Sequence, residues 1–124
     1  MEFLNYENFD KTKYRNFIKN MYEICDKVCL YVSKENSLYD KYFNYIKDPD
    51  LLESLLKIKG YAFELVSDVK IFEFNYKFFE WLNDFCSFKQ FIECNNYIEV
   101  FVFIKDKKII FDLISHEKIA FLYN

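Results

Sequence analysis

The chain has 124 residues, of which 52% are hydrophobic and 30% charged, and its formal net charge is −3. These values predict one globular domain that spans residues 1–124, and they exclude a disordered chain. A mildly acidic chain with a single arginine is also a poor candidate for direct binding to nucleic acid, which depends on neutralising phosphates.

No apolar run approaches the roughly 18 residues that a membrane-spanning helix needs. The first residues, from Met1 to Glu7, lack the basic start and the apolar stretch of a signal peptide. We therefore expect a cytoplasmic protein with no membrane partner, in which the four cysteines stay reduced.

Aromatic side chains dominate the composition, with 16 Phe and 11 Tyr against one Gly and one Pro. Each large ring buries much apolar area, so a chain of this length can still build a solid core. The same composition leaves one histidine and no glycine-rich phosphate loop, and it contains no known nucleophile motif. These features favour a protein that binds a partner over an enzyme.

A long helix is expected near the N-terminus. Apolar residues recur at helical spacing from Tyr14 to Val32, which predicts an amphipathic helix over residues 10–33. Asp10 is placed to cap its first turn.

Two shorter helices are expected next. Ser37 can cap the first of them, with Tyr42 on its inward side. The sequence Asp48-Pro49-Asp50 is typical of a helix start, and Gly60 is typical of a helix end.

The middle of the chain is ambiguous. Residues 61–75 fit a helical pattern, yet the residue types favour a strand over residues 69–75, and we expect the strand. Residues 77–93 are expected to form one further helix.

The C-terminal third has the clearest β pattern. Residues 97–104, 109–114 and 118–123 are rich in β-branched and aromatic residues and are separated by polar turns. The predicted fold class is therefore α+β, with N-terminal helices packed on a C-terminal antiparallel β-meander in a single domain.

Both faces of the expected hairpin are apolar. The alternation places one group on one side and a second group on the other: Ile98, Val100, Val102 and Ile104, against Tyr97, Phe101 and Phe103. Either the chain's own helices cover both faces, or one face meets a partner or a second copy.

The cysteines do not have the spacing of a metal site. In the expected helix Cys25 and Cys29 lie one turn apart on the same side, while Cys86 and Cys94 are far along the chain. We expect buried structural thiols, no metal and no cofactor.

His116 is the only imidazole, and it lies in an expected turn between Ser115 and Glu117. A serine and a histidine adjacent in an extended segment point apart, so their proximity does not imply a nucleophile and its base. We expect a solvated histidine and no catalytic residue.

The excess of acidic residues lies in one segment. Residues 61–94 contain three lysines and six acidic residues, namely Glu64, Asp68, Glu73, Glu80, Asp84 and Glu93. Glu80 and Asp84 are spaced to share the exposed side of the expected helix. A solvated face, an acidic contact surface and a cation site are the alternatives for them.

A small, acidic, aromatic-rich domain without a catalytic motif is typical of a binding protein, in which aromatic anchors and rim charges set affinity and approach. The expected function is therefore a small non-enzymatic inhibitor of another protein. The target class is a nuclease-type effector that itself binds nucleic acid, as for a phage anti-CRISPR protein or a toxin immunity protein. The expected partner-binding residues are Glu73, Tyr76, Glu80, Trp81 and Asp84.

The alternative function is a self-associating structural or adaptor domain. It would form a homodimer through the apolar face of the C-terminal sheet. An enzyme is the least favoured class.

Overall fold

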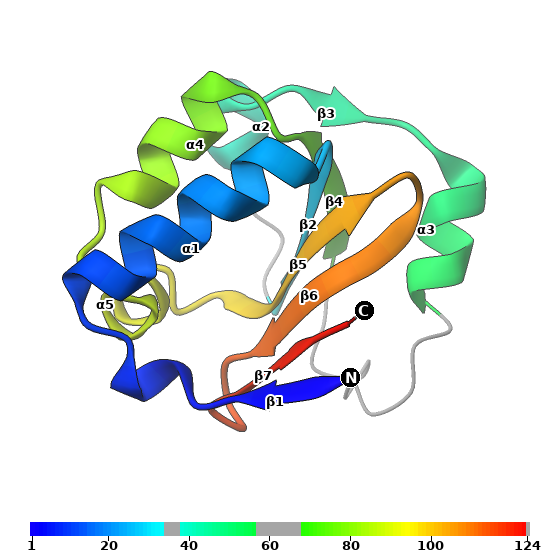
Figure 1. Cartoon of the computed structure of the whole chain (residues 1–124). Coiled ribbons are helices and arrows are strands. Elements are labelled where there is room, and N and C mark those ends of the chain that lie inside the picture. The colour runs from blue at the N-terminus through cyan, green and yellow to red at the C-terminus, as the bar shows by residue number, and fades with distance from the viewer. Residues whose placement is uncertain (34–37, 57–67, 124) are drawn as a thin grey trace.

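The computed structural model describes residues 1–33, 38–56 and 68–123. Over these residues the chain forms one seven-stranded antiparallel sheet with helices on both faces, which confirms the α+β class (Figure 1). The strands are β1 (Glu2–Leu4), β2 (Lys27–Val32), β3 (Tyr45–Ile46), β4 (Asp68–Glu73), β5 (Ile98–Lys105), β6 (Lys108–Ile114) and β7 (Ile119–Leu122). The helices are η1 (Tyr6–Asn8), α1 (Lys11–Ile24), α2 (Leu38–Tyr42), α3 (Pro49–Leu56), α4 (Tyr76–Asn83) and α5 (Phe88–Cys94).

The strand order is β1-β7-β6-β5-β2-β4-β3. The expected C-terminal meander is present as β5, β6 and β7. Four strands from the first 73 residues extend the sheet on both sides, so it is not a purely C-terminal element.

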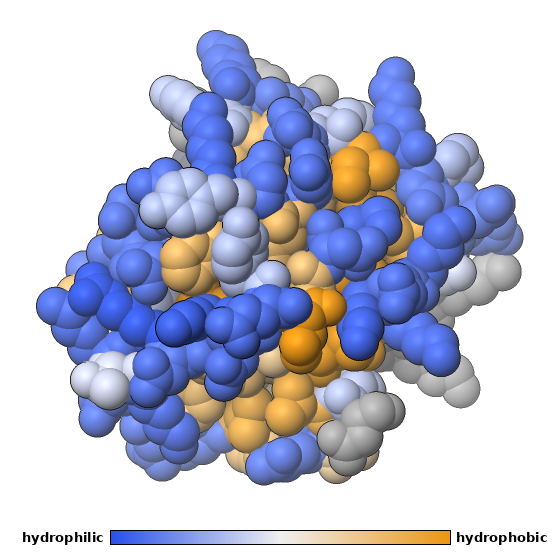
Figure 2. Space-filling model, turned by 45° about the horizontal axis from the view of Figure 1, so that its top comes forward, coloured by the Kyte–Doolittle hydropathy of each residue, from blue (hydrophilic) through white to orange (hydrophobic). Residues whose placement is uncertain are grey.

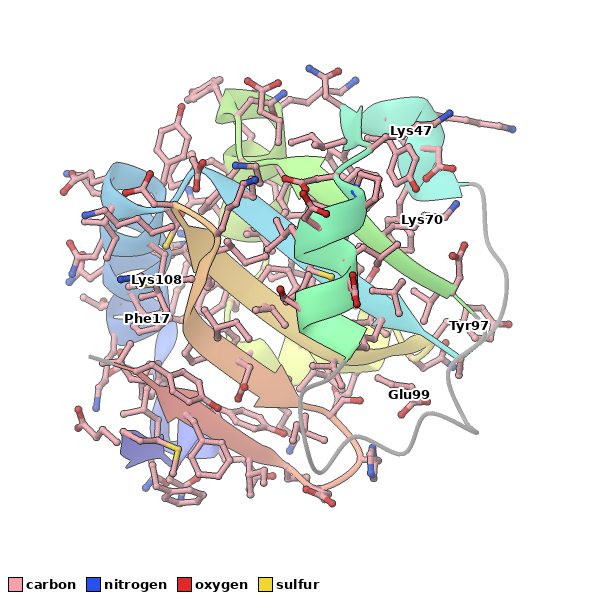
Figure 3. All side chains as sticks on the ribbon, turned by 90° about the vertical axis from the view of Figure 1, so that its right-hand side faces the viewer. Phe17, Lys47, Lys70, Tyr97, Glu99 and Lys108 are labelled. Carbon is pink, nitrogen blue, oxygen red and sulfur yellow. The ribbon has the colours of Figure 1, made fainter. Side chains whose placement is uncertain are left out.

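The two faces of the sheet carry different helices. Helices α1, α4 and α5 lie on one face, and α3 lies on the other (Figures 1 and 3). Two separate clusters of buried side chains correspond to this division. We call the face under α1, α4 and α5 the first face and the face under α3 the second face.

The prediction of one helix over residues 10–33 is wrong in its second half. Asp10 does cap α1, because its Oδ1 accepts a hydrogen bond from the Lys13 amide at 2.8 Å. The helix ends at Ile24, and Cys25 is already extended. Residues 27–32 form β2 in the centre of the sheet, between β5 and β4.

The physical reason lies in the double burial of β2. Five of its six residues are buried, with Val28 and Leu30 in the first-face cluster and Cys29 and Tyr31 in the second. A strand covered on both faces is apolar at every position, so its sequence can also match a helical spacing.

The prediction of one helix over residues 77–93 is also wrong, because two helices occupy this segment. Helix α4 ends at Asn83, and α5 begins after Ser87, whose Oγ accepts a hydrogen bond from the Gln90 amide at 3.0 Å. Ser87 is a local start signal that the longer apolar pattern concealed.

Other expectations are confirmed where the structure describes them. Asp48 caps α3, since its Oδ1 accepts from the Leu51 amide at 3.1 Å. The strand expected over residues 69–75 is β4, which spans Asp68–Glu73. Ser37, Gly60 and residues 61–67 lie outside the described residues.

Candidate functional site

Helix α4 carries most of the predicted binding residues. Asn75 caps it by accepting a hydrogen bond from the Phe78 amide at 3.0 Å. Phe78 and Leu82 are buried against the first face of the sheet. Tyr76 and Glu80, four residues apart, therefore share the exposed side of the helix.

Tyr76 and Glu80 are well presented to solvent. The Tyr76 side chain is 60% exposed, and its ring lies 6.0 Å from that of Phe79. Phe79 in turn stacks on Tyr22 of α1 at 4.7 Å. An exposed tyrosine is thus held above a packed pair of rings, which limits its loss of side-chain entropy on binding.

Asp84 lies at the C-terminal end of α4 and not within the helix. It is the C-cap residue, and its amide donates to the Glu80 carbonyl at 3.1 Å. Arg15, the only arginine, donates from Nε to the Asn83 carbonyl at 3.1 Å. Within the described part of the chain, neither Glu80 nor Asp84 has a basic side chain within ion-pair distance.

Trp81 is part of the core rim and is only half-buried. Its ring contacts five aromatic rings at centroid distances of 5.1–5.8 Å, those of Tyr39, Phe43, Phe78, Phe85 and Phe91. These contacts fix the indole between α2, α4 and α5. Trp81 can therefore offer one edge to a partner, while most of its ring stabilises the fold.

Some acidic side chains of residues 61–94 interact with other side chains of the protein. Asp68 lies 3.4 Å from Lys70, and Glu73 accepts a hydrogen bond from the Asn44 amide nitrogen at 2.9 Å. Glu64 is outside the described residues. Glu73 is nevertheless exposed, as are Glu80 and Asp84, so these three carboxylates lie at the surface near α4.

The sequence analysis missed two exposed tyrosines beside α4. Tyr42, expected on an inward helix side, is 54% exposed, and Tyr45 of β3 is 44% exposed. Lys77 of α4 lies over the Tyr42 ring at 5.7 Å. Helix α2, β3 and the start of α4 come together at the top of Figure 1. We call the surface formed by Glu73, Tyr76, Glu80, Trp81 and Asp84, with Tyr42 and Tyr45 beside them, the α4 surface.

A pocket of about 210 Å³ opens beside this surface, between β3 and α3. It is lined by Tyr45, Ile46, Lys47, Asp48, Pro49, Leu52, Val69 and Ile71. Most of these side chains are apolar, and Lys47 at its rim reaches toward solvent (Figure 3). Figure 2, in which the top of Figure 1 comes forward, shows apolar patches between hydrophilic side chains.

The cysteines do not lie on one helix side, contrary to expectation. Cys25 is the C-cap of α1 in the first-face cluster, and Cys29 is in β2 in the second-face cluster. Burial raises the pKa of the Cys25 thiol to about 12 and raises that of Cys29 as well. Cys86 and Cys94 are exposed, so the expectation of buried thiols is wrong for these two. Among the described residues no group of three or more metal-binding side chains gathers.

His116 lies in the β6–β7 turn, as expected, and is partly exposed. Its Nδ1 is 3.3 Å from Glu99 Oε2, and its Nε2 is 3.9 Å from Glu117 Oε1. The Ser115 hydroxyl donates to the Ile98 carbonyl at 2.8 Å. Ser115 therefore holds the strand end, and the structure places no Ser–His pair here.

The apolar side chains of β5 are covered on both sides within the chain, whereas Tyr97, just before the strand, is 42% exposed. Ile98, Val100, Val102 and Ile104 are each at most 2% exposed, as are Phe101 and Phe103. A β-bulge near Val32 moves Ile98 to the first-face cluster, although the alternation had placed it with Val100. The face expected to mediate self-association is thus buried.

No helix among the described residues is long and apolar enough to cross a membrane. Comparisons with known proteins gave no match: no family model matches the chain, and neither a curated protein nor a solved structure matches it.

Proposed function

We propose that the protein is a non-enzymatic inhibitor that binds a cytoplasmic protein through the α4 surface and blocks it. The target class is a nuclease-type effector whose basic nucleic-acid groove meets the carboxylates of Glu73, Glu80 and Asp84. Trp81 and Tyr76 supply apolar contact at the same surface.

One observation carries this proposal. Tyr76 is 60% exposed on α4, and Glu80 lies one turn away on the same exposed side. The opposite side of the helix is buried in the core through Phe78 and Leu82. A rigid aromatic anchor beside a carboxylate matches the anatomy of an interface, in which aromatic residues bind and charges guide approach.

The test measures association with a panel of purified nucleases, both RNA-guided effectors and toxin nuclease domains. A cognate member of the panel should bind, and its association rate should fall steeply as salt rises, because exposed charges are screened beyond a Debye length of about 8 Å at physiological ionic strength. The double variant Glu80→Lys/Asp84→Lys should slow association at low salt and leave the melting temperature unchanged.

A matched control separates local from global charge. The double variant Glu7→Lys/Glu93→Lys makes the same change in net charge at exposed positions of η1 and α5. It should leave the association rate within about twofold of wild type. Equal effects of the two double variants would contradict a role for the α4 surface.

A further inference from the structure

Strand β3 is an edge of the sheet, and its register shows which backbone groups face outward. Tyr45 lies opposite Phe72, and Ile46 lies opposite Ile71. The Glu73 amide donates to the Asn44 carbonyl at 2.9 Å, so Asn44 and Glu73 form a hydrogen-bonded pair of the ladder, next to the Tyr45–Phe72 pair. Hydrogen-bonded and non-hydrogen-bonded pairs alternate in an antiparallel ladder. The Tyr45 amide and carbonyl therefore point away from β4.

No further strand pairs with this outer edge in the part of the chain that the structure describes. An unpaired edge can accept another extended chain, because its backbone donors and acceptors lie at the spacing of a new strand. If a partner strand extends the pairing, the backbone amide and carbonyl of Lys47, two residues beyond Tyr45, point outward in the same way.

The pocket adjoins this edge on the second face of the sheet. Ile46, Val69 and Ile71 form its floor, and Leu52 of α3 forms one wall. Its volume of about 210 Å³ exceeds the roughly 150 Å³ of an apolar cavity that accepts benzene. It can therefore hold one leucine-sized or phenylalanine-sized side chain.

We propose that the β3 edge binds an extended segment of a partner protein as an added strand, with one apolar side chain of that segment seated in the pocket. Backbone hydrogen bonds at Tyr45 recognise an extended polypeptide, and the pocket selects the side chain. The alternation of side chains along a strand lets a single peptide satisfy both requirements. This site goes beyond the proposed function, because it does not use the carboxylates of the α4 surface.

The experiment selects ligands from a displayed library of random 12-residue peptides and synthesises the best binder as the probe. Titration of the ¹⁵N-labelled protein with this peptide should shift the amide signals of Tyr45, Ile46, Lys47 and Leu52. Failure to select any peptide, or shifts confined to Tyr76, Glu80 and Asp84, would overturn the proposal. The second outcome would still agree with the proposed function.

Backbone pairing is tested on the peptide, where no protein variant has to fold. Methylation of alternate peptide amides that face β3 should weaken binding at least tenfold, and methylation of the intervening amides should change it less than threefold. Equal effects of the two series would show that no strand is added.

Protein variants test the same edge and the pocket. Tyr45→Pro removes the outward amide, whereas Tyr45→Ala keeps it and removes only the side chain, so Tyr45→Pro should weaken binding at least fivefold more. Leu52→Asp places a charge in the pocket and should weaken binding at least tenfold. Ser54→Asp, an exposed position on the same helix, is its matched control and should have little effect. Binding that is unaffected by Leu52→Asp would exclude the pocket.

Discussion

The two faces of the sheet are built from different side chains, although adjacent residues of the same strands supply both. On β5, Phe101 and Phe103 point to the first face, while Val100 and Val102 point to the second. The first face is interlocked by rings, with Phe103 alone in contact with four others at centroid distances of 4.8–6.4 Å. The second face packs aliphatic side chains under α3.

The choice of aromatic or aliphatic side chains depends on the helices that cover each face. Helices α1, α4 and α5 pack on the first face, and large rings fill the space between helix and sheet with much area per residue. The second face also contains a buried carboxylate. Asp112 is 1% exposed there, opposite Val102, and accepts a hydrogen bond from the Tyr123 hydroxyl at 2.7 Å.

The largest expected difference between the two faces comes from truncating two neighbouring residues of β5. Phe103 and Val102 are both fully buried, on the first and second faces respectively. Phe103→Ala should lower the free energy of unfolding by about 3–5 kcal/mol. Val102→Ala should cost about 1.5–3 kcal/mol, in line with the smaller area lost. Urea unfolding measures both, and equal losses would mean that the ring network adds nothing to stability.

A smaller effect on stability is expected from removing one buried tyrosine hydroxyl on each face. Tyr14, on the first face, donates to the Leu82 carbonyl of α4 at 2.6 Å, and Tyr31, on the second, donates to the Leu55 carbonyl of α3 at 2.8 Å. Tyr14→Phe and Tyr31→Phe should each cost about 1–3 kcal/mol, because a buried carbonyl loses a donor. The Leu82 carbonyl then keeps only the longer bond from the Phe85 amide, at 3.3 Å. Chemical denaturation would reveal any imbalance, and a cost near zero at either site would show that water replaces the hydroxyl there.

The free energy of unfolding should fall gradually at alkaline pH, because both faces contain buried groups with raised pKa values. Burial raises the pKa of Cys25 from 9.0 to about 12 on the first face and raises those of Cys29 and Tyr31 on the second. The unfolded chain loses these protons first, so stability present below pH 9 should fall as pH rises above it, by at most about 1.4 kcal/mol per pH unit for each group.

The readout for this pH dependence is the midpoint of urea unfolding between pH 7 and pH 10.5. The double variant Cys25→Ala/Cys29→Ala should have a flatter profile between pH 9 and pH 10 than wild type, whatever its stability at neutral pH. Identical slopes would mean that the two thiols ionise alike in the folded and unfolded states.

Much of the fold could be predicted from local sequence. Asp10 and Asp48 marked two helix starts, because a side-chain oxygen satisfies the free amides of a first turn wherever the helix lies. The β5–β6 hairpin was also predicted, since its residue types and its polar turn act over a few residues.

The candidate site was predicted in part. Helical spacing predicted that Glu80 and Asp84 are exposed, which the structure confirms, whereas Tyr76 was named only as an aromatic residue beside them. Tyr42 and Tyr45 could not be placed there, because their proximity to α4 depends on the pairing of β3 with β4. The pocket beside β3 was equally inaccessible, since its walls come from three separate elements.

Local sequence was sufficient to predict the fold class, the caps at Asp10 and Asp48, and the alternation of residues 100–104 between the two faces. The assembled fold was needed to show that residues 27–32 form an interior strand and that the 77–93 segment is interrupted between Asn83 and Phe88. Helical and strand periodicities cannot be told apart where every position is apolar. The burial of β2 on both faces, between β4 and β5, is a property of the assembled sheet, and it leaves no polar position between Val28 and Val32 to mark the period.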